Sequence, residues 1–433
     1  MSSEVREDFL VRDPIHGFID LSEYEFVQEI VESPEFQRLR RLAQLGFSTM
    51  VYPSAEHNRF SHCLGAMQIF WRLFDRIKPG MIDGEIAVKK LREYGTAVAL
   101  LHDIGHGPFS HAAEQAFDFD HEDIGKELIL TSSISKILND HGLDPMELTR
   151  ILEGTADKKF APLSQLVSSQ LDVDRLDYLL RDAYFTGIGF GNVDLDRIIS
   201  TMVVCQEEML KGQAINLYKG RFSLESYILT RHLMYQAVYF HKATRAAELL
   251  FRNVVKRAKL LRDRIEIPPE LSFIKENRKP SSRDIVELDD NLMYTQFCRW
   301  RKSDDAILSE LCDRIINRKL LKAVEIPPEK TTFIWEERKN IEEIAQRNGI
   351  DAEYFCPSDS PTDLPYQPYS PKEPDDKPNV ITNIFVLNER EKPEEISHLS
   401  NVVASLSHPQ YANRLYCPEI IREEVSNLLK QHG

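Results

Sequence analysis

The segment Ala97-Val-Ala-Leu-Leu-His-Asp-Ile-Gly-His-Gly-Pro-Phe-Ser-His111 decides how this chain is interpreted. An apolar run typical of a buried helix leads directly into His102 and Asp103, and glycine and proline residues then end the helix. An imidazole and a carboxylate on consecutive residues can both reach one divalent cation, and burying them without a cation or a partner is costly. His106 is therefore expected in a loop that faces the same site.

Two further candidate ligands lie upstream and downstream of this pair. They are His62, in Asn58-Arg-Phe-Ser-His-Cys-Leu-Gly65, and Asp174, in Leu171-Asp-Val-Asp-Arg-Leu-Asp-Tyr178. Taken alone, a histidine on an apolar face is more often a core residue, and the carboxylates near residue 174 are equally typical of a solvated surface. Together with His102 and Asp103, they complete a nitrogen and oxygen ligand set. The sequence thus predicts metal-dependent hydrolysis of phosphate esters or anhydrides.

Length and composition indicate a globular protein of the cytoplasm. The 433 residues allow one large domain with an appendage, or two to three domains, and 42% hydrophobic with 28% charged residues is ordinary for such chains. Six scattered cysteines without a Cys-x-x-Cys pair argue against a zinc ribbon or a disulfide scaffold. The first residues, MSSEVREDFL, lack the apolar core of a secretory signal. No apolar stretch approaches the ~20 residues of a membrane span.

The net charge of −15 limits the partners that this chain can bind. Sequence-independent binding of nucleic acid depends on neutralising phosphates, so an acidic protein needs a local basic patch for it. Nucleic acid is therefore disfavoured as a partner. A small polyanionic substrate would likewise require a metal and concentrated cationic side chains. Six of the thirteen histidines do fall between residues 57 and 121.

Helices dominate the expected secondary structure up to about residue 260. Apolar residues recur every three or four positions at residues 24–31 and 34–42, and Ser33-Pro34 is a typical helix start. By the same criterion, helices are expected at residues 62–78, 84–104, 122–139, 145–153, 163–183, 192–204 and 223–265. Residues 207–218 are expected to form a short hairpin, with 214–218 as the better strand.

The pattern changes beyond about residue 267. Helices are expected at residues 286–316 and 418–431, and strands at 331–335 and 379–386. Seven of the 22 prolines fall within residues 356–378, which predicts an extended linker or surface loop. We predict a mainly α fold with a smaller α+β C-terminal region. Its expected parts are a helical core at 1–265, a helical or α+β extension at 266–355, the linker at 356–378 and an α+β segment at 379–433.

The ordered motifs of residues 9–260 carry a family resemblance. His62, His102, Asp103 and Asp174 are similar to the ligand signature of the HD-domain phosphohydrolases. The surrounding motifs are Asp13-Pro-Ile-His-Gly17, Phe36-Gln-Arg-Leu-Arg40, Gln44-Leu-Gly46, His57-Asn-Arg-Phe-Ser-His62, His102-Asp-Ile-Gly-His-Gly-Pro-Phe-Ser-His111 and Leu171-Asp-Val-Asp-Arg-Leu-Asp-Tyr178. In this order they resemble the deoxynucleoside triphosphate (dNTP) triphosphohydrolase branch, which includes bacterial enzymes and a mammalian SAM- and HD-domain enzyme.

The resemblance implies a reaction and a cofactor. Family members attack the α-phosphorus and release a deoxynucleoside and inorganic triphosphate. One divalent metal ion is implied at the four ligands, with Mg, Mn, Fe, Ni and Zn all open. His111 and His121, together with His106, match the catalytic imidazoles, which suit proton transfer near neutral pH. Glu114 and Glu122 are candidates to orient one of them.

The substrate-binding positions also follow from the resemblance. Arg59, His106, Arg175, Arg231 and Lys242 match phosphate contacts, and Arg175 stands where the mammalian enzyme has lysine. Tyr178 and Asp182 match positions beside the sugar and phosphate, and Tyr239 matches one against the sugar and base. Gln44 is expected to bind the 3′-hydroxyl, and Leu45 to fill the space of a 2′-hydroxyl, which selects deoxyribose by steric exclusion. For Leu45 and Tyr239 alone, ordinary helix packing is an equally good interpretation.

The family also implies regulation. Members often form homo-oligomers, dimers or tetramers, with an activator nucleotide at subunit contacts. Gln37 and Arg40 match activator-binding positions, and Glu32 replaces an aspartate that reads a guanine edge. The lysine expected before Asp13 is absent. A dGTP-type activator is therefore an expectation, with a different activator or none as the alternatives.

Two other functions remain open at the level of sequence. One is an HD phosphatase or phosphodiesterase acting on nucleoside monophosphates or cyclic nucleotides, although a single phosphate does not require so many cations. The other is a nucleotide-sensing module that binds without turnover, although the complete ligand set argues against an inactive site.

Overall fold

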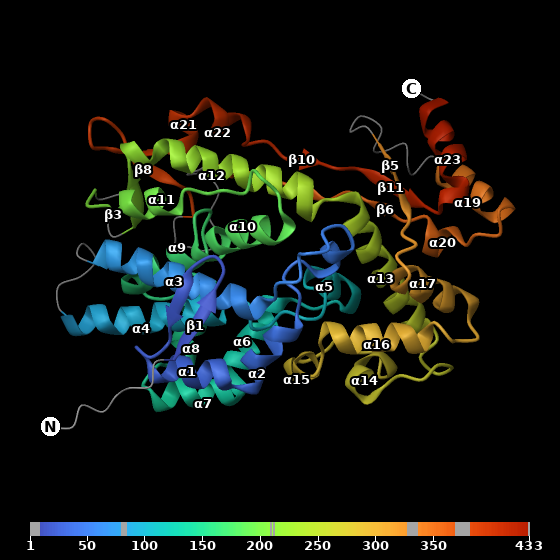
Figure 1. Ribbon diagram of the computed structural model, residues 1–433, viewed down its shortest axis with the longest axis horizontal. Coiled ribbons are helices and arrows are strands. Elements are labelled where there is room, and N and C mark those ends of the chain that lie inside the picture. Colours follow the sequence, from blue (N-terminus) through green and yellow to red (C-terminus); the bar gives the residue numbers. More distant parts are fainter. Residues whose placement is uncertain are drawn as a thin grey trace.

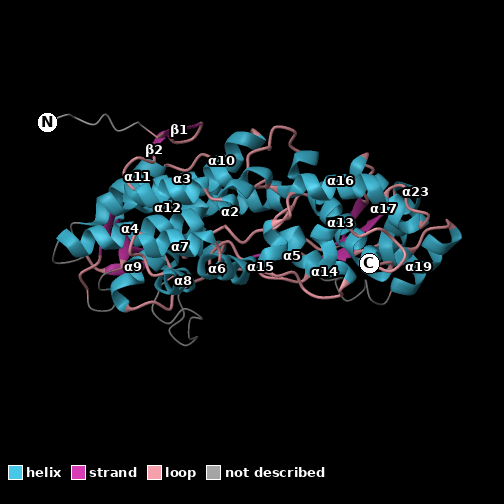
Figure 2. Cartoon of the chain, turned by 90° about the horizontal axis from the view of Figure 1, so that it is seen from below, coloured by secondary structure: helices cyan, strands magenta, loops and turns pink. Residues whose placement is uncertain are grey.

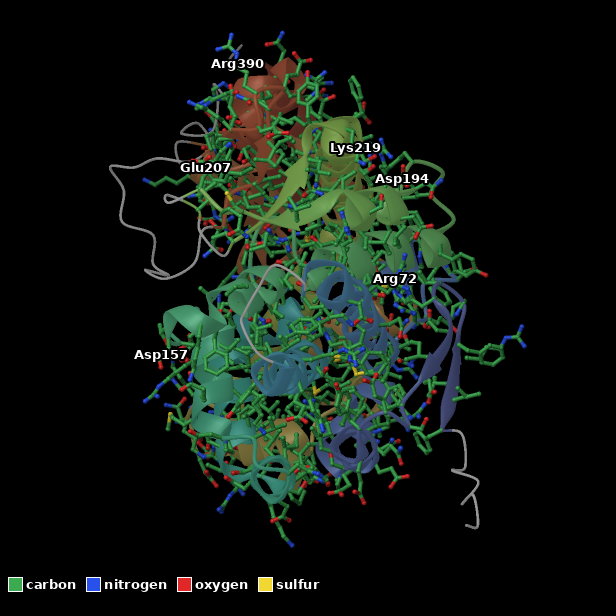
Figure 3. All side chains as sticks on the ribbon, turned by 90° about the vertical axis from the view of Figure 1, so that its left-hand side faces the viewer. Arg72, Asp157, Asp194, Glu207, Lys219 and Arg390 are labelled. Atoms are coloured by element: carbon green, nitrogen blue, oxygen red, sulfur yellow. The ribbon has the colours of Figure 1, made fainter. Side chains whose placement is uncertain are left out.

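The computed structural model describes residues 9–78, 85–207, 210, 213–326, 337–368 and 382–431. The chain is mainly helical, and its strands form small separate sheets (Figures 1 and 2). This confirms the predicted fold class. No helix within the described residues is both long and apolar enough to cross a membrane. Charged residues such as Asp157, Asp194, Glu207, Lys219 and Arg390 are exposed on the outer surface (Figure 3).

The N-terminal core is a bundle of helices built around α3 and α4. Its helices are α1 (Glu25–Glu32), α2 (Pro34–Gln37), α3 (Arg59–Ile77), α4 (Glu85–Leu101), α5 (His111–Phe117), α6 (His121–Thr131), α7 (Ser133–Asp140), α8 (Pro145–Glu153), α9 (Ala161–Val167), α10 (Val173–Thr186), α11 (Leu195–Thr201), α12 (Arg221–Met234) and α13 (Lys242–Leu260). Helix α3 packs against both α4 and α10. These three helices thereby bring distant parts of the sequence together at the centre of the core.

Several helices are shorter than the apolar periodicity predicted. The expected helices at 122–139, 163–183 and 286–316 are each two helices, and 223–265 is interrupted by a π-helical turn at Tyr235–Tyr239. Residues 192–204 end in a strand, and Arg38–Arg41 form a 3₁₀ turn after α2. Capping side chains explain the breaks, because Ser132, Asp172 and His241 accept hydrogen bonds from the first turns of α7, α10 and α13. Helix α5 was not predicted.

Four small sheets accompany the helices in the part of the chain that the structure describes. The pair β1 (Leu10–Asp13) and β2 (Gly17–Asp20) is an antiparallel hairpin. The largest sheet has the order β3-β4-β8-β9, formed by Met202–Val204, Ala214–Leu217, Phe385–Leu387 and Pro393–Glu395. The others are β5 (Lys322–Glu325), β11 (Arg414–Cys417) and β6 (Ser358–Asp359), and β10 (Gln410–Tyr411) with β7 (Thr362–Asp363).

The strand predictions were confirmed only in part. The better hairpin strand is β4, but it pairs with β3, which precedes the expected hairpin. The expected strand at 379–386 begins only at Phe385 in β8, and residues 379–381 and 331–335 lie outside the described residues. Strand β8 runs parallel to β4. The C-terminal segment therefore adds strands to a sheet of the N-terminal core.

The remaining helices form the C-terminal region. They are α14 (Ser272–Lys275), α15 (Ser282–Val286), α16 (Asp290–Trp300), α17 (Ala306–Ile316), α19 (Arg338–Arg347), α20 (Ala352–Phe355), α21 (Ile396–Leu399), α22 (Asn401–Ser405) and α23 (Glu419–Gln431). Helix α13 extends from the core to α17, against which it packs (Figure 1).

The described part of the expected linker, residues 356–368, contains both buried and exposed residues. Cys356 and Tyr366 are buried, and β6 and β7 pair with strands near the C-terminus. Asp359 is bound by Arg245 of α13. Within residues 356–368 the segment is thus a surface loop anchored by short strands and buried side chains, because prolines at strand ends and turns are compatible with such packing. The division of the chain into domains stays a prediction.

Candidate metal centre and its cavity

The four predicted metal ligands converge. His62 lies in α3, Asp174 in the first turn of α10, and His102 and Asp103 directly after α4. His62 Nε2 is 3.0 Å from Asp174 Oδ1 and 3.2 Å from His102 Nε2. The Asp103 carboxylate lies 3.6 Å from each of the two imidazole Nε2 atoms.

This geometry and donor chemistry fit one divalent cation. Adjacent ligands of an octahedral ion with bonds of ~2.1 Å are about 3 Å apart, close to the distances observed. Burial lowers the pKa of His62, but hydrogen bonds to Asp174 and Asp177 outweigh it and raise the pKa to about 10. These carboxylates thus stabilise positive charge at His62, and a bound metal ion would supply such a charge.

Each ligand imidazole is oriented through its other nitrogen. His62 Nδ1 is 2.8 Å from the carboxylate of Asp177, and His102 Nδ1 is 2.9 Å from the carbonyl oxygen of Ala99. A proton on Nδ1 satisfies both contacts and leaves the Nε2 lone pairs directed at the centre. The tautomers that a metal requires are therefore built into the fold.

Asp177 belongs to a buried charge network that sequence reasoning did not assign to the site. Arg181 donates two hydrogen bonds to Asp177, at 2.8 and 3.0 Å, and a third to Asp13 at 2.7 Å. His16 Nε2 is 2.6 Å from Asp177. A Cβ on Gly65 of α3 would lie 2.0 Å from Asp177 Oδ1, so only glycine permits this approach. The motifs around Asp13 and Asp177 carried the signal, because both place charged residues in otherwise apolar segments.

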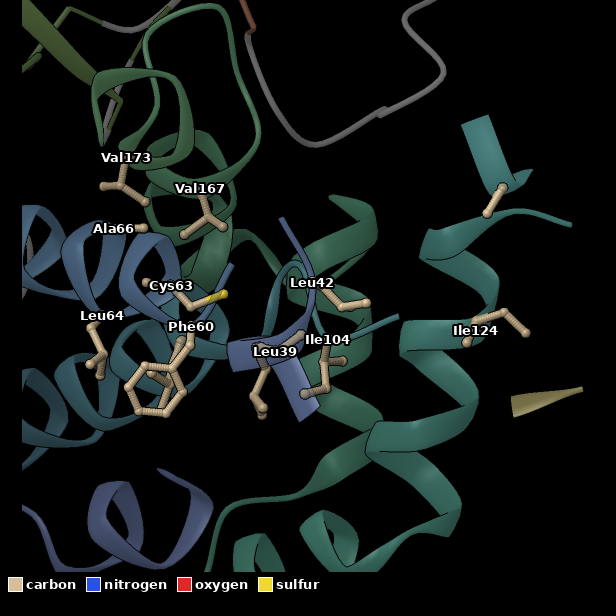
Figure 4. Packing of buried hydrophobic residues seen from close by; sticks show 14 of the residues in the cluster. Leu39, Leu42, Phe60, Cys63, Leu64, Ala66, Ile104, Ile124, Val167 and Val173 are labelled. Carbon is tan, nitrogen blue, oxygen red and sulfur yellow. The ribbon is translucent and has the colours of Figure 1, made fainter. Parts of the chain in front are cut away.

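Apolar and cationic residues hold the surrounding backbone. Leu39, Leu42 and Ile104 are buried beside Phe60 and Cys63 of α3 in one cluster (Figure 4). The fully buried Arg38 donates hydrogen bonds of 2.8 Å to the carbonyl groups of Ile104 and His106. This anchors the loop that follows the ligand pair, which accounts for arginine in a buried motif.

The predicted catalytic histidines form a second cluster around Glu114. His111 Nδ1 and His121 Nδ1 lie 2.8 and 2.9 Å from the two oxygens of Glu114. The ring of His106 stacks on that of His121 at 3.9 Å, and its Nε2 is 3.4 Å from Asp103. Glu122 has no hydrogen bond to these imidazoles among the described residues, so Glu114 is the orienting carboxylate.

The environment separates the pKa values of these histidines. Burial and the charge of Arg59 lower the pKa of His106 to about 3. Burial also acts against the charge on His121, but the hydrogen bond to Glu114 outweighs it and raises the pKa of His121. Burial of Glu114 is itself outweighed by its imidazole partners, which hold its pKa well below the usual range. His121 therefore retains its proton more strongly than an ordinary histidine.

A cavity of about 360 Å³ opens onto both clusters. Among the predicted site residues, it is lined by Gln44, Leu45, Arg59, Asp103, His106, His111, His121, Asp174, Arg175, Tyr178, Asp182 and Tyr239. Arg59 binds Asp103, and Arg175 donates to the carbonyl of Ser169 at 2.5 Å. Arginines, imidazoles and metal ligands thus share the lining of one cavity.

Two predicted phosphate contacts do not line this cavity. Arg231 donates to the carbonyl of Pro365 at 2.7 Å and lies over the ring of Tyr235. Lys242 lines a separate cavity of about 280 Å³ with Arg318 and Lys322. The π-helical turn presents Tyr235 and Tyr239 to the main cavity, while Lys242 follows it as the first residue of α13.

The predicted sugar-binding residues lie together. Tyr239 donates a hydrogen bond of 2.7 Å to Asp182, whose other oxygen is 2.7 Å from His57 Nε2. The ring of Tyr178 meets that of Tyr239 edge to face. The side-chain oxygen of Gln44 is buried and has no hydrogen-bond partner among the described residues. An unsatisfied acceptor at a cavity wall suits a ligand hydroxyl.

A residue of the C-terminal region supports the cavity. Phe109 and Ser110 both have a φ of 57°, a strained conformation for residues other than glycine. Asp290 of α16 accepts hydrogen bonds of 2.8 Å from the backbone N–H groups of Phe109 and Ala43. Burial raises the pKa of Asp290 to about 6. This carboxylate ties the strained loop to the Gln44 segment, and sequence reasoning missed it because it lies far away in the chain.

The expected activator-binding residues lie outside the cavity. Gln37 accepts a hydrogen bond of 2.9 Å from Arg40 Nε, and the Arg40 guanidinium lies over the ring of Phe60. Glu32 and Arg40 are exposed. The three residues are thus accessible on the α1–α2 side of the core, and their role stays a prediction.

Known protein families match nearly the whole chain. The HD domain matches residues 59–182, and the HD associated region matches residues 193–432. The uncharacterized protein YwfO of Bacillus subtilis is 34% identical over 428 residues, which cover 96% of this chain and 94% of YwfO. The deoxynucleoside triphosphate triphosphohydrolase SAMHD1 homolog of Dictyostelium discoideum is 28% identical over 70% of this chain and 64% of its own length.

A solved structure shares the fold. The crystal structure of a phosphohydrolase from Bacteroides thetaiotaomicron superposes with a TM-score of 0.78 at 29% identity, covering 95% of this chain and all of that chain. The agreement in both sequence and fold confirms the resemblance to HD phosphohydrolases. It also supports the assignment of a divalent metal to the His/Asp cluster.

Proposed function

Because the chain belongs to the HD domain family and carries the HD associated region, it is a metal-dependent phosphohydrolase, and we propose that its substrates are dNTPs. The supporting observation is the shared cavity of about 360 Å³, which joins the metal centre, the imidazole cluster, two arginines and the Gln44-Leu45 pair. The proposed products are a deoxynucleoside and inorganic triphosphate. A phosphatase or phosphodiesterase function would use this cavity less completely, because a single phosphate has neither the charge nor the length to contact all of these groups.

Two arginines and His106, which its lowered pKa leaves uncharged near neutral pH, are proposed to hold the triphosphate. Arg59, His106 and Arg175 line the same cavity as Asp103 and Asp174. Fixed donors in a partly enclosed site stabilise a polyanion without reorganisation during the reaction. A divalent ion bound by His62, His102, Asp103 and Asp174 would polarise the α-phosphate. Arg231 and Lys242, which lie outside this cavity, are left out of the proposed substrate contacts.

The imidazole cluster is proposed to move the proton. Hydrolysis forms a bond between the water oxygen and the α-phosphorus and breaks the bond from the α-phosphorus to the 5′-oxygen. The 5′-oxygen then needs a proton. His121, whose pKa is raised by its bond to Glu114, is the proposed donor, and the exposed His111 bonded to the same carboxylate is its proposed relay to solvent.

The Gln44 side of the cavity is proposed to select the sugar. The unpaired Gln44 oxygen is available to the 3′-hydroxyl, and Leu45, which lines the same cavity, is proposed to fill the space that a 2′-hydroxyl would need. Tyr239, which is held by Asp182, provides a flat wall for the deoxyribose. A polar group forced against Leu45 would lose its hydrogen bonds with water, so ribonucleotides would bind more weakly.

Regulation by a nucleotide and assembly into a homo-oligomer, a dimer or tetramer, form a separate part of the proposal. The exposed carboxylate of Glu32, beside Gln37 and Arg40, has the acceptor that a guanine edge requires. We also propose a cytoplasmic location, because all six cysteines are free.

A product assay tests the proposed function. The purified chain is incubated with each of the four dNTPs and four NTPs, and separately with the four deoxynucleoside monophosphates, with Mg²⁺ or Mn²⁺, and with or without added dGTP. The expected result is inorganic triphosphate and deoxynucleoside from dNTPs, with little product from NTPs. Orthophosphate from nucleoside monophosphates without triphosphate from dNTPs would identify a phosphatase. Saturable dNTP binding without any product would identify a sensing module.

A further inference from the structure

Helix α13 contributes an ion pair to the lining of the main cavity, and this pair takes no part in the reaction proposed above. Arg245 and Glu248 both line the cavity, with side chains 15% and 20% exposed, and Arg245 Nη1 donates to Glu248 Oε2. Arg245 Nε and Nη2 donate to the two oxygens of Asp359 at 2.8 and 2.7 Å. The guanidinium is therefore fixed in position by a carboxylate from the segment 356–368.

This ion pair retains hydrogen-bonding capacity on the cavity side. A guanidinium has five N–H donors, and these contacts use three of them. Glu248 Oε1 has no hydrogen-bond partner among the described residues, and burial raises the pKa of Glu248. Donors and an acceptor thus stand side by side, a pairing that a planar heterocycle can match.

The net charge of Arg245 and its two carboxylate partners disfavours contact with the triphosphate. One arginine between two carboxylates leaves a net negative charge, which repels a polyanion. Arg59 and Arg175 are not balanced by two carboxylates in this way and are the proposed triphosphate contacts, so the uncharged base is the part of the substrate suited to Arg245 and Glu248. The rings of Phe109, Tyr235 and Phe240 also line the cavity and offer flat faces to a base.

We propose that Glu248, positioned by Arg245 and Asp359, reads the base of the substrate and favours guanine. The proposal rests on the dNTP triphosphohydrolase function above. Guanine presents an acceptor, O6, beside two donors, N1–H and the N2 amino group. An arginine N–H group can donate a hydrogen bond to O6, and a carboxylate can accept hydrogen bonds from both N1–H and the N2 amino group. The Watson–Crick edges of adenine, cytosine and thymine offer Glu248 only one donor position each, so each forms one hydrogen bond fewer.

A substrate analogue tests this assignment without altering the protein. Deoxyinosine triphosphate keeps O6 and N1–H but lacks the N2 amino group. A hydrogen bond to a charged group is worth about tenfold or more in kcat/KM, so dGTP should be preferred over this analogue and over dATP, dCTP and dTTP by about that factor. Equal kcat/KM for dGTP and the inosine analogue would overturn the proposal.

A variant pair tests the residue. Glu248→Gln should lower kcat/KM for dGTP about tenfold, leave the other three dNTPs within about threefold and remove the discrimination against the inosine analogue. Glu342→Gln, at an exposed ion pair on α19, is the matched control and should behave as the parent chain. A uniform loss for all dNTPs, at unchanged metal content and Tm, would refute base reading while leaving the triphosphohydrolase function intact. Absence of triphosphate release from every dNTP by the parent chain would refute both.

Discussion

Two groups of histidines lie side by side in this molecule and are built in opposite ways. In the metal centre His62 is buried and the His102 side chain is only 9% exposed, and each ring nitrogen that faces away from the centre has a partner of its own. His106, His111 and His121 instead crowd around the single carboxylate of Glu114, and the side chain of His111 is 71% exposed. One group is fixed in place, whereas the other has a route to solvent.

The difference indicates a division of labour. A metal ligand works best when its tautomer and orientation cannot change, and surrounding charges provide that constraint. A proton donor must exchange its proton with water after every turnover, so it needs contact with an exposed neighbour. His121, stacked on buried His106 and sharing Glu114 with exposed His111, meets that requirement. The comparison predicts that substitutions in the two groups produce different defects.

The largest expected effect comes from the metal ligands themselves. His102→Ala combined with Asp103→Ala removes an imidazole and a carboxylate from the centre, so metal binding and hydrolysis should both be abolished. Metal analysis of the purified variant and triphosphate release from dNTPs measure the two properties. Substantial activity in a variant without bound metal would disprove the assignment of this group as the metal centre.

A change in the second group should separate chemistry from metal binding. His121→Gln removes the proposed proton donor but leaves all four ligands in place. We expect kcat to fall about 10²- to 10⁴-fold with unchanged metal content. Lys136→Gln, on the surface of α7, is a control for handling and stability. Loss of metal from the His121 variant would mean that the two groups are not separate.

The constraint on the first group can be weakened without touching a ligand. Asp177→Asn keeps the shape of the side chain but removes the charge shared by His62, His16 and Arg181. Metal affinity should fall about 10- to 100-fold, and activity should return with excess metal. The free energy of unfolding should also drop by about 3 kcal/mol or more, because buried Arg181 loses a partner. A titration with metal and a denaturant curve provide the readouts, and unchanged affinity would contradict the proposed role.

The sequence predicted local features of these groups better than distant ones. His102, Asp103 and His106 fall within one motif, so short-range reasoning placed them near a helix end, although α4 ends at Leu101, before the pair, and not at residue 104. Their supports depend on contacts between distant segments, such as Arg181 with Asp13 and Asp290 with Phe109, which no local pattern reveals. The assignment of metal and substrate roles to individual residues stays a prediction.

The helix boundaries show the same limit. Apolar periodicity continues through residues 122–139, although the Ser132 side chain caps a new helix within it. Lys242 was predicted as a phosphate contact from the family resemblance alone. It follows the π-helical turn at Tyr235–Tyr239 as the first residue of α13, and it lines a different cavity. Neither periodicity nor motif thus shows which side chains share a site.

The smallest expected effect concerns the pH dependence of the second group. Glu114 raises the pKa of His121, and a proton donor must be protonated to act. Activity should therefore decline as the pH rises through this elevated pKa. Glu114→Gln removes the carboxylate charge, so the pKa of His121 should fall and the decline should begin at lower pH. At acidic pH, where His121 is protonated in both proteins, the difference in rate should be at its minimum. Profiles of kcat/KM against pH for the two proteins, at saturating metal, measure the shift. A variant profile displaced toward higher pH would show that Glu114 does not hold the proton on His121, and the second group would then need another source for its proton.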